Sequence, residues 1–412
     1  MSLIQVTNEE LLDIESECYD MIQTGLEDNA LNLANTGFFD EFVENIFDYM
    51  YEAGLNQGWC SIDDDEELFG MVHNWCIEAF YCMKIPMREN PDSTTNEITP
   101  EENAKTLQWL KTFPNHAQRT AEWYAQRHTL FSASNMWKLF GTPAQYNSLI
   151  YEKCNDVKKM EFEGDILSPN ARNWGIKYEP VSVQVYEHKY NTVVNTSYGC
   201  IPHSTLPIGA SPDGINEKPD HPKYGRMLEI KNIYNREMNG IPSKEYWTQM
   251  QIQMETCRLE QCDFLETRFK EYSKEDFESD AVHEYKGVVL FFIPKDGNDV
   301  QPHFVYVPLF VESVDQWVDQ KKETLNTHIL YMTFYWYLDE MYCSLVERND
   351  TWFQAAIPII QEGWETVLKE RNSGFAHRAP QKKVAKAPEM VSGGLDLNIM
   401  NLVKCDENGN AL

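Results

Sequence analysis

The stretch IGASPDGINEKPDHPKYGRMLEIK, residues 208–231, contains two short apolar segments joined by a polar loop. The first segment ends at Asp213, and after fifteen intervening residues the second carries Glu229 and Lys231. Because side chains alternate in direction along a strand, Glu229 and Lys231 are expected to share one face while Ile230 points into the core. Antiparallel pairing of the two segments would then bring Asp213 to Glu229 at the strand ends.

This set of side chains predicts a magnesium site. Two carboxylates, from Asp213 and Glu229, and the backbone carbonyl of Ile230 offer the hard oxygen ligands that Mg²⁺ prefers, and Mn²⁺ is expected to substitute for it. Lys231 can orient or deprotonate a water and offset charge on a pentavalent phosphate, while the metal acts as Lewis acid. The alternative is that Lys231 and the acids simply form ion pairs.

The Glu-x-Lys pattern alone is a weak signal, because it occurs at residues 187–189, 229–231 and 284–286. An ion pair on a strand surface is the default interpretation of the first and the third. Only the second follows an apolar strand start and has a Pro-Asp-Gly turn upstream on another apolar segment. The pattern at 229–231 is therefore the predicted site.

Neighbouring segments support this choice. A helix is predicted over residues 243–261, with Ser243 as its N-cap. The glutamines of this helix have two interpretations. Side-chain amides that face a metal can hold a water or a phosphate without adding charge, whereas glutamine is also a common residue on the solvent-exposed face of a helix. Upstream, Glu179 is either a further acid of the site or a surface residue. Spacings of three and four residues put three polar side chains on or near one face of the helix: Tyr246, Gln249 and Gln253.

A second cluster suits an anion. Ser132 or Ser134 at a predicted helix start would present a hydroxyl and free backbone N–H groups to a phosphate. The Arg127 guanidinium could bind the same phosphate through two hydrogen bonds. The alternative for Ser134 is an ordinary N-cap. The helix is predicted to run through Phe140 and to stop at Gly141.

Periodicity divides the chain into four predicted units. These are an acidic helical domain at 1–100, a mixed α/β core at 103–310, C-terminal helices packed on that core at 311–380, and a disordered tail at 381–412. Asn90–Glu102 is expected to be a linker. One hairpin is predicted from strands at 288–294 and 303–308 around a turn at 295–298. Another is predicted from five valines: Val181, Val183, Val185, Val193 and Val194.

The charge is unevenly distributed. The net charge of −30 argues at first against nucleic-acid binding, because phosphates attract Lys and Arg. However, residues 1–100 hold 22 acidic and two basic residues, whereas the remaining 312 hold 43 and 33. The acidic segment could restrain DNA binding, mimic phosphates for a basic partner, extend an oligomer interface, or have no effect on the core.

Composition excludes several classes of protein. Hydrophobic residues make up 42% of the 412, which rules out wholesale disorder. The longest apolar stretch in the middle of the chain, Val288–Ile293, is too short to span a bilayer, and the acidic amino terminus has no signal-peptide character. An intracellular, soluble protein without a membrane anchor is expected. The ten cysteines include no C-x-x-C, and no Gly-rich phosphate loop is present, so neither a zinc ribbon nor an ATPase is expected.

The order and spacing of five motifs resemble the YqaJ-type viral recombinases, the lambda-exonuclease-like branch of the PD-(D/E)xK nucleases. The resemblance covers about residues 115–310. The motifs are Trp123…Arg127…Ser132-Ala133-Ser134, Gly175…Glu179, Gly209-Ala210-Ser211-Pro212-Asp213-Gly214, Leu228-Glu229-Ile230-Lys231 and Tyr246-Trp247-Thr248-Gln249-Met250-Gln251.

This resemblance implies a restriction-endonuclease-like core, a mixed sheet flanked by helices, with Mg²⁺-dependent 5′-to-3′ degradation of double-stranded DNA ends during recombination, replication or repair. The family's site residues fall on Asp213 and Glu229 (metal), Lys231 (catalytic), Glu179 (accessory acid), Gln249 (helix glutamine), and Arg127 with Ser134 (5′-phosphate).

The resemblance also implies partners and a setting. They are a single-strand annealing protein, a homo-oligomer, and a host cytoplasm or viral factory. The acidic front and the 311–380 segment do not belong to the shared core and resemble the enlarged forms of large DNA viruses. They put the family's ring-shaped trimer in question.

Two alternatives to the exonuclease stay open. One is a structure-specific or nicking endonuclease on the same core, because the metal motif fixes the chemistry and not the polarity. The other is a non-catalytic DNA- or protein-binding subunit, against which the intact Asp213, Glu229 and Lys231 argue.

Overall fold

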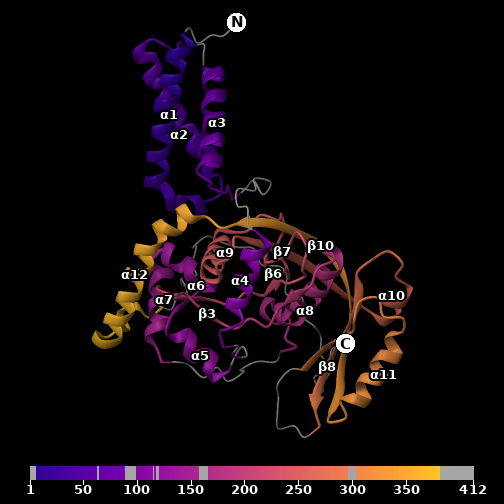
Figure 1. Cartoon of the computed structure of the whole chain (residues 1–412). Coiled ribbons are helices and arrows are strands. Elements are labelled where there is room, and N and C mark those ends of the chain that lie inside the picture. The colour runs from indigo at the N-terminus through magenta and orange to yellow at the C-terminus, as the bar shows by residue number, and fades with distance from the viewer. Residues whose placement is uncertain are drawn as a thin grey trace, which may run out of the picture.

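The structure, a computed structural model, describes residues 6–62, 65–88, 99–114, 116, 120–156, 166–295 and 303–380. A tower of three helices stands on an α/β body, and a lobe of strands and helices extends from one side of that body (Figure 1). The tower consists of α1 (Asn8–Asn29), α2 (Phe38–Gln57) and α3 (Asp65–Cys82), and the short 3-10 helix η1 (Ala30–Ala34) lies at its base.

The body is built on a mixed seven-stranded sheet with the order β2-β5-β6-β7-β10-β8-β9. Strands β6 and β7 are parallel, and every other neighbouring pair is antiparallel. The expected mixed α/β core is thus confirmed. The strands are β2 (Val194–Asn195), β5 (Gly214–Asn216), β6 (Met227–Asn232), β7 (Gln261–Tyr272), β8 (Lys286–Pro294), β9 (His303–Tyr306) and β10 (His328–Glu347).

A second, three-stranded sheet has the order β1-β4-β3. Its strands are β1 (Phe131–Ser132), β3 (Ile201–Pro202) and β4 (Ile208–Ala210). The remaining helices are α4 (Pro100–Leu110), α5 (Ala121–His128), α6 (Ala133–Met136), η3 (Trp137–Phe140), α7 (Pro143–Cys154), α8 (Ala171–Tyr190), α9 (Lys244–Cys257), α10 (Lys274–Ser279), α11 (Val314–Thr324), α12 (Asp350–Ser373) and η4 (Ala376–Arg378).

Strand β6 is sandwiched between two helices. Leu228 and Ile230 pack in one apolar cluster with Tyr186 of α8. Met227 belongs to the cluster that contains Trp247 of α9. Alternate side chains therefore meet opposite helices, as the period of a strand requires.

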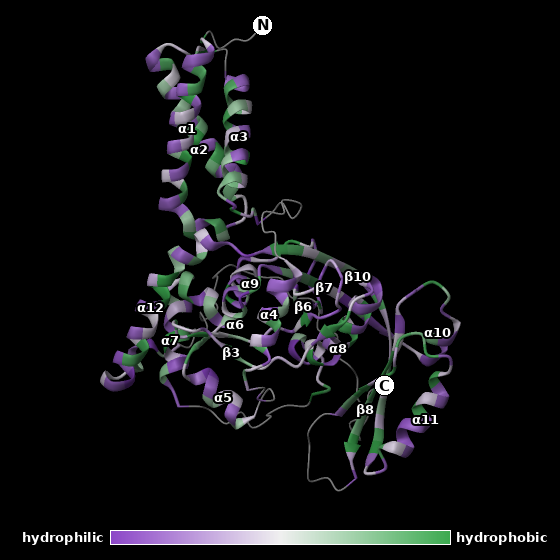
Figure 2. Ribbon diagram, in the orientation of Figure 1, coloured by the Kyte–Doolittle hydropathy of each residue, from purple (hydrophilic) through white to green (hydrophobic). Residues whose placement is uncertain are grey.

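The tower helices are amphipathic. Figure 2 shows hydrophobic and hydrophilic residues recurring along α1, α2 and α3, and the buried positions follow helical spacing, as with Ile14, Cys18 and Ile22 on α1. The helical character predicted for the acidic N-terminal segment is confirmed over its described residues. None of the helices in the described ranges is long and apolar enough to cross a membrane.

The prediction of C-terminal helices over 311–380 is wrong in its first half. Before α12, only α11 is helical there, and β10 is a 20-residue strand between β7 and β8 in the sheet. The first half of β10 pairs with β8 and the second half with β7. Register shifts after Leu330 and after Leu338 interrupt the alternation that would have identified a strand, while the Tyr, Phe and Trp content does fit β structure.

The predicted valine hairpin is also wrong. Val181, Val183 and Val185 lie inside α8, and only Val194 is in a strand. Val181 and Val185 are buried together with Tyr178, which is three- and four-residue spacing. The i, i+4 pair fits a helix and a strand equally, and packing against the sheet decides between them despite the β-branched residues.

Two predicted boundaries shift. Helix α9 is capped by Ser243 as expected but ends at Cys257, because Arg258 adopts a left-handed conformation. The expected linker ends earlier than Glu102, since a capping box between Thr99 and Glu102 starts α4. Residues 89–98, the turn at 296–298 and the tail from 381 lie outside the described residues, whereas β8 and β9 do pair antiparallel as predicted.

The base of the tower is bonded to the body. Arg88 donates to Ala34 O (2.7 Å) at the base of the tower and to Pro242 O (2.5 Å) just before α9. Lys244 donates to Asn35 Oδ1 (2.8 Å). One apolar cluster runs from the tower into the body and includes residues of α2, α9 and α12. Tower and body therefore share part of their core.

Candidate active site

The two strands of the predicted motif pair as the sequence suggests. Gly214 of β5 lies opposite Leu228 of β6, which places Asp213 beside the middle of β6. The backbone N–H of Ile230 donates to Asp213 Oδ2 (2.8 Å). This bond fixes one carboxylate oxygen of Asp213 against the strand that carries Glu229.

Glu229 is the most enclosed charge of the site, with 1% of its surface exposed. Three side chains donate to its carboxylate: Lys231 and Gln249 (2.7 Å) to Oε1, and Gln253 (2.8 Å) to Oε2. Lys231 also forms an ion pair with it. The ion pair that the sequence left open as an alternative is thus present between Lys231 and Glu229. The same site also offers oxygen ligands that a metal could use.

Helix α9 supplies both amides. Gln249 and Gln253 are one turn apart and face β6, while Gln251 points away and bonds to Glu347 O (2.9 Å) and the Asn349 N–H (2.7 Å). The one-face prediction for the glutamines is confirmed. Gln253 bonds directly to the Glu229 carboxylate, a contact that the sequence pattern did not specify. Its four-residue spacing from Gln249 is the sequence signal that places it on the same helix face.

Tyr246 sits one turn before Gln249. Lys231 Nζ lies 4.6 Å from the centre of its ring, an arrangement typical of a cation–π contact. The ring also has the Arg236 guanidinium at 5.7 Å. Arg236 had no distinguishing signal in the sequence, because it lies in the loop after β6.

A pocket of about 320 Å³ opens at the end of β6. Glu179 from α8, Lys231 from β6 and Tyr246 from α9 all line it. The structure therefore brings Glu179 to the same pocket as Lys231, as predicted. Glu179 also acts on Asp213 through its charge.

Burial and neighbouring charges shift the pKa values of Asp213 and Lys231. Burial and the charges of Glu229 and Glu179 raise the pKa of Asp213 well above its ordinary value, against the opposing effects of Lys231 and the Ile230 N–H. Burial disfavours the charged form of Lys231, but Glu229 and Asp213 outweigh it and raise the lysine pKa. Lys231 is therefore a cation at neutral pH, and Asp213 is an acid whose charge is costly without a counterion.

These residues fit a divalent cation. No three His, Cys, Asp or Glu side chains gather at metal-binding range in the described parts of the chain, so a cation would rely on the two carboxylates and other oxygens. Gln253 Oε1 is buried without a hydrogen-bond partner beside Glu229. Carboxylate, amide and carbonyl oxygens are the ligands of Mg²⁺ and Mn²⁺.

The other two Glu-x-Lys patterns lie elsewhere and have structural partners. Glu187, near the end of α8, accepts from the Val194 N–H (2.7 Å). Lys286 of β8 donates to Phe277 O (2.8 Å). Neither residue lines the pocket that Glu179 and Lys231 share.

Arg127 and Ser134 come together as predicted. Arg127, on α5, donates to Ser134 Oγ (3.4 Å), and its guanidinium stacks at 4.4 Å from the ring centre of Trp123. Ser134 is exposed, whereas Ser132 occupies the N-cap position of α6 without a capping bond from its hydroxyl. Helix α6 is four residues long and continues as η3 to Phe140 with Gly141 as the C-cap, so the predicted end is confirmed, although the second half is a 3-10 helix.

The cluster is tied to the acidic site through the small sheet. Ser132 of β1 lies opposite Gly209 of β4, four residues before Asp213, and α6 packs on α9. Lys153 is buried, and its ammonium group donates to Arg127 O (2.8 Å). No sequence pattern had marked this lysine. Burial lowers the pKa of Lys153 to about 8.

Comparisons with known proteins point to one family. Residues 122–260, which contain every predicted site residue, match the YqaJ-like viral recombinase domain. An uncharacterized protein of Acanthamoeba polyphaga mimivirus is 26% identical over 345 residues, which cover 73% of this chain and 60% of that protein. The chain thus spans less than two thirds of this relative.

Two solved structures of LHK-Exo, an alkaline exonuclease from Laribacter hongkongensis, are also similar. The complex with dAMP is 18% identical and covers 62% of this chain and 95% of its own, with a TM-score of 0.36. The other is 20% identical and covers 63% and 95%, with a TM-score of 0.34. The match over 122–260 confirms the resemblance drawn from the motifs: this segment of the chain is similar to the YqaJ-like viral recombinase domain.

Proposed function

We propose that the protein is a Mg²⁺-dependent DNA exonuclease that degrades one strand of duplex DNA from its 5′ end, in viral recombination, replication or repair. The observation that carries the proposal is the convergence of Asp213, Glu229 and Lys231 at strand β6, with two α9 amides on the Glu229 carboxylate. A purely structural ion pair needs neither the second carboxylate nor the amides.

Each residue has a chemical task in this proposal. Asp213, Glu229 and the Ile230 carbonyl would hold the cation, which supplies Lewis acidity and a water nucleophile when bound. Lys231, a cation at neutral pH, offsets the charge that builds up on the phosphate oxygens. Gln249 and Gln253 keep the Glu229 carboxylate in one orientation. Glu179 lines the open side of the pocket, where it can accept a proton from a water.

Support for the polarity comes from Arg127 and Ser134. A guanidinium held flat on Trp123 and an exposed hydroxyl 3.4 Å away form a site for a terminal phosphate. A 5′-phosphate bound there would place a nearby phosphodiester at the carboxylates, because β1 and β4 link the two clusters.

The proposal is tested with the full chain, Mg²⁺ and two DNA substrates. One is a linear duplex, and the other is the same sequence as a covalently closed circle. An exonuclease consumes the linear form and leaves the circle intact. Cleavage of the circle would replace the proposal by a structure-specific or nicking endonuclease, and no cleavage of either form with Mg²⁺ or Mn²⁺ would favour a non-catalytic DNA-binding subunit.

A further inference from the structure

An aromatic row follows the seam between α2 and α3 on the tower. Phe47 lies 5.5 Å from Tyr51 and 5.3 Å from Phe69, measured between ring centres. Phe69 and Phe39 lie 6.4 Å and 5.7 Å from His73. With Ile77 added, these six residues (Phe39, Phe47, Tyr51, Phe69, His73 and Ile77) are called the aromatic face below.

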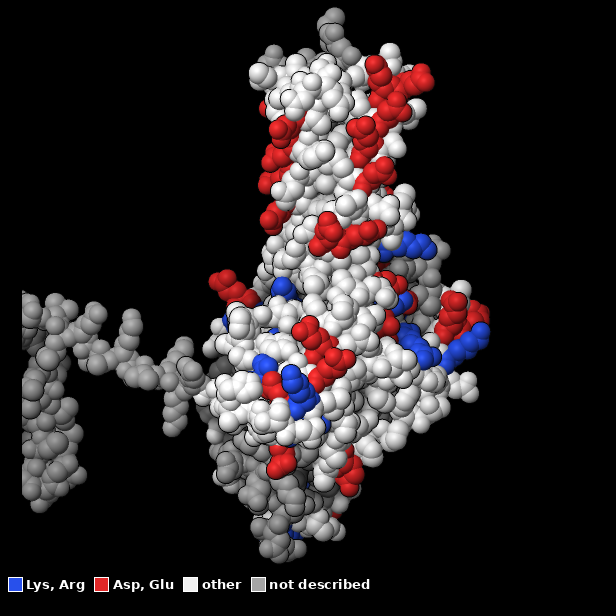
Figure 3. Space-filling model, turned by 90° about the vertical axis from the view of Figure 1, so that its left-hand side faces the viewer, with Lys and Arg blue, Asp and Glu red and all other residues white. Residues whose placement is uncertain are grey.

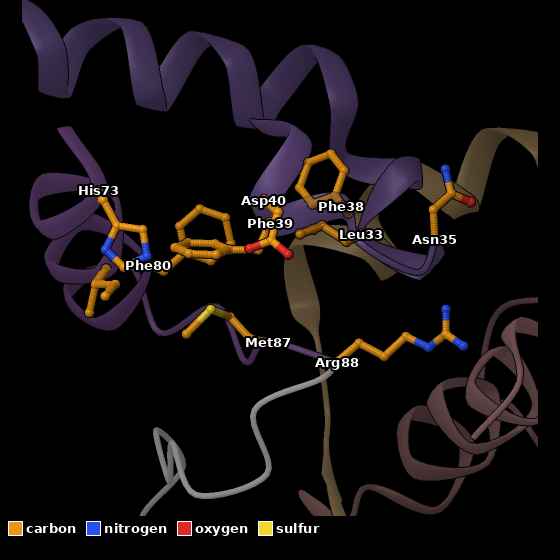
Figure 4. A pocket seen from close by; sticks show the side chains of 10 residues that line it. Leu33, Asn35, Phe38, Phe39, Asp40, His73, Phe80, Met87 and Arg88 are labelled. Carbon is orange, nitrogen blue, oxygen red and sulfur yellow. The ribbon is translucent and has the colours of Figure 1, made fainter. Parts of the chain in front are cut away.

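The lower end of the aromatic face is hollow. A pocket of about 300 Å³ lies there, at the base of the tower. Figure 4 shows the rings of Phe38, Phe39 and Phe80 around this pocket, with Met87 across from them and Asp40 at its edge. A pocket of this size and lining can receive one large apolar side chain.

The aromatic face is open to solvent. Phe69 and Ile77 keep 38% and 39% of their surface exposed, although both are large and apolar. Single exposed apolar residues are ordinary, but a continuous row that ends in a pocket is typical of a protein–protein interaction site.

Acidic residues border this face. Asp40, Glu44 and Asp48 follow each other at four-residue steps on α2, so they form one exposed line next to Phe39 and Phe47. Residues 1–100 contain only two bases, Lys84 and Arg88. Figure 3 shows acidic side chains along the tower and basic ones only at its base and on the body.

This charge selects among the possible occupants. DNA is repelled by the acidic border, and so is the tower of a second copy. A segment that is apolar on one side and rich in Lys and Arg on the other matches both the aromatic row and its border. From Phe39 to Tyr51 the row measures roughly 18 Å, at 1.5 Å per helical residue, which is the length of a helix of about 12 residues.

We propose that the aromatic face binds a basic amphipathic helix of a partner protein, with one large apolar side chain of that helix in the pocket at the tower's base. The mode is an amphipathic helix laid into an apolar groove, anchored at positions three and four residues apart. Such binding would attach a partner to the tower, away from the Glu229 carboxylate in the body.

The test measures the binding of a labelled peptide to the full-length protein by fluorescence anisotropy. The probe is a helical peptide with leucine along one face and lysine elsewhere. A matched peptide has serine in place of leucine and therefore keeps the charge. We expect the leucine peptide to bind at least about tenfold more tightly, because the apolar anchors are what the aromatic face recognises.

Variants of the tower locate the site. Phe69→Ser with Ile77→Ser, and separately Asp40→Asn with Glu44→Gln and Asp48→Asn, should each weaken peptide binding about tenfold. Two matched controls lie off the aromatic face and should change it less than about twofold. They are Leu12→Ser with Tyr49→Ser, which removes exposed apolar surface, and Asp13→Asn with Glu17→Gln and Asp20→Asn, which removes the same charge from α1.

Three results would overturn the proposal. Equal weakening by the α1 and α2 charge variants would show binding to the acidic tower as a whole. Equal affinity for the leucine and serine peptides would show that no apolar recognition occurs. Self-association of the wild-type protein that the Phe69→Ser, Ile77→Ser variant abolishes would assign the aromatic face to a second copy. Circular dichroism of each variant checks that the helices are retained.

Discussion

At the scale of single residues, Asp213 is a carboxyl group whose ionisation the fold disfavours. Burial, Glu229 and Glu179 raise its pKa, so the folded protein binds a proton there more tightly than the unfolded chain does. The unfavourable contribution is absent below the ordinary carboxyl pKa, grows as the pH rises from that value to the folded-state pKa, and is constant above it. A cation bound beside Asp213 would offset it.

Asp213→Asn should therefore stabilise the metal-free protein at neutral pH, and this gain should shrink as the pH falls toward 4. Thermal melting of the wild type and the variant across pH, in EDTA, measures the difference. In Mg²⁺ the order should reverse, because only the wild type gains stability from metal binding. A variant that melts lower than wild type in EDTA at every pH would contradict this account of the site.

In the proposed function, Arg127 recognises the end of the strand. Its contacts to Trp123 and Ser134 place it for a terminal phosphate. Arg127→Ala should remove the preference for 5′-phosphorylated over 5′-hydroxyl duplex and reduce cleavage of the phosphorylated substrate about tenfold or more, from the loss of a bidentate charged contact. Initial rates on the two substrates measure the effect. An equal loss on both would indicate a general role in folding or DNA binding.

At the scale of elements, β10 joins the body to the lobe. Its Trp336 is fully buried and lies opposite Gly287 of β8. A Cβ on Gly287 would meet the indole at 2.7 Å, and a rigid ring in a strand cannot yield easily. The close approach of β8 and β10 thus depends on this glycine.

Gly287→Ala should lower the free energy of unfolding by about 1–3 kcal/mol, the usual cost of overpacking a core. Gly70→Ala on α3 is the matched control, since nothing lies within 4 Å of the added methyl and alanine favours helix by about 0.5–1 kcal/mol. Urea unfolding followed by circular dichroism compares the two variants. Equal stabilities for both would mean that β8 and β10 are not packed as described.

The elements also show what a sequence can predict. The strand–loop–strand motif at 208–231 and the capped helix α9 follow from local signals, namely alternation, a turn and an N-cap. The strand β10 and the helix α8 do not, because two register shifts hide the period of β10 and valine spacing fits both structures.

The same limit applies to the site. The residues of the candidate site that have local signals, such as Glu229 with Lys231, can be predicted from the sequence. Lys153 and Arg236 reach the candidate site through contacts between residues far apart in the sequence, and no local sequence pattern marks either of them.

At the scale of the whole molecule, the charge of the tower is separated from the body by distance. Helix α1 has 22 residues and is roughly 33 Å long, with its start at the far end of the tower (Figure 1). Charges there lie several Debye lengths, of about 8 Å each, from the body at physiological salt. An acidic segment that restrains DNA binding would have to act through the acids near the base.

Neutralising Glu9, Asp13 and Glu17 to their amides should therefore leave the affinity for duplex DNA unchanged within about twofold at physiological salt. Titrations of labelled duplex at two salt concentrations measure this. Tighter binding that disappears as salt is raised would show that the whole tower repels DNA. Deleting residues 1–100 is a poorer test, because it would expose the apolar core that α2 shares with α12.

The central claim is that the cluster at Glu229 hydrolyses DNA from an end. The most direct measurement follows nucleotide release from a 5′-phosphorylated linear duplex with Mg²⁺, using wild type, Glu229→Gln and Glu284→Gln side by side. Glu284 is an exposed acid of another Glu-x-Lys pattern and serves as the matched control. The account predicts that Glu229→Gln lowers the rate at least about a hundredfold, since several kcal/mol of transition-state stabilisation are lost, and that Glu284→Gln keeps the wild-type rate. A Glu229→Gln protein as active as the wild type would contradict it.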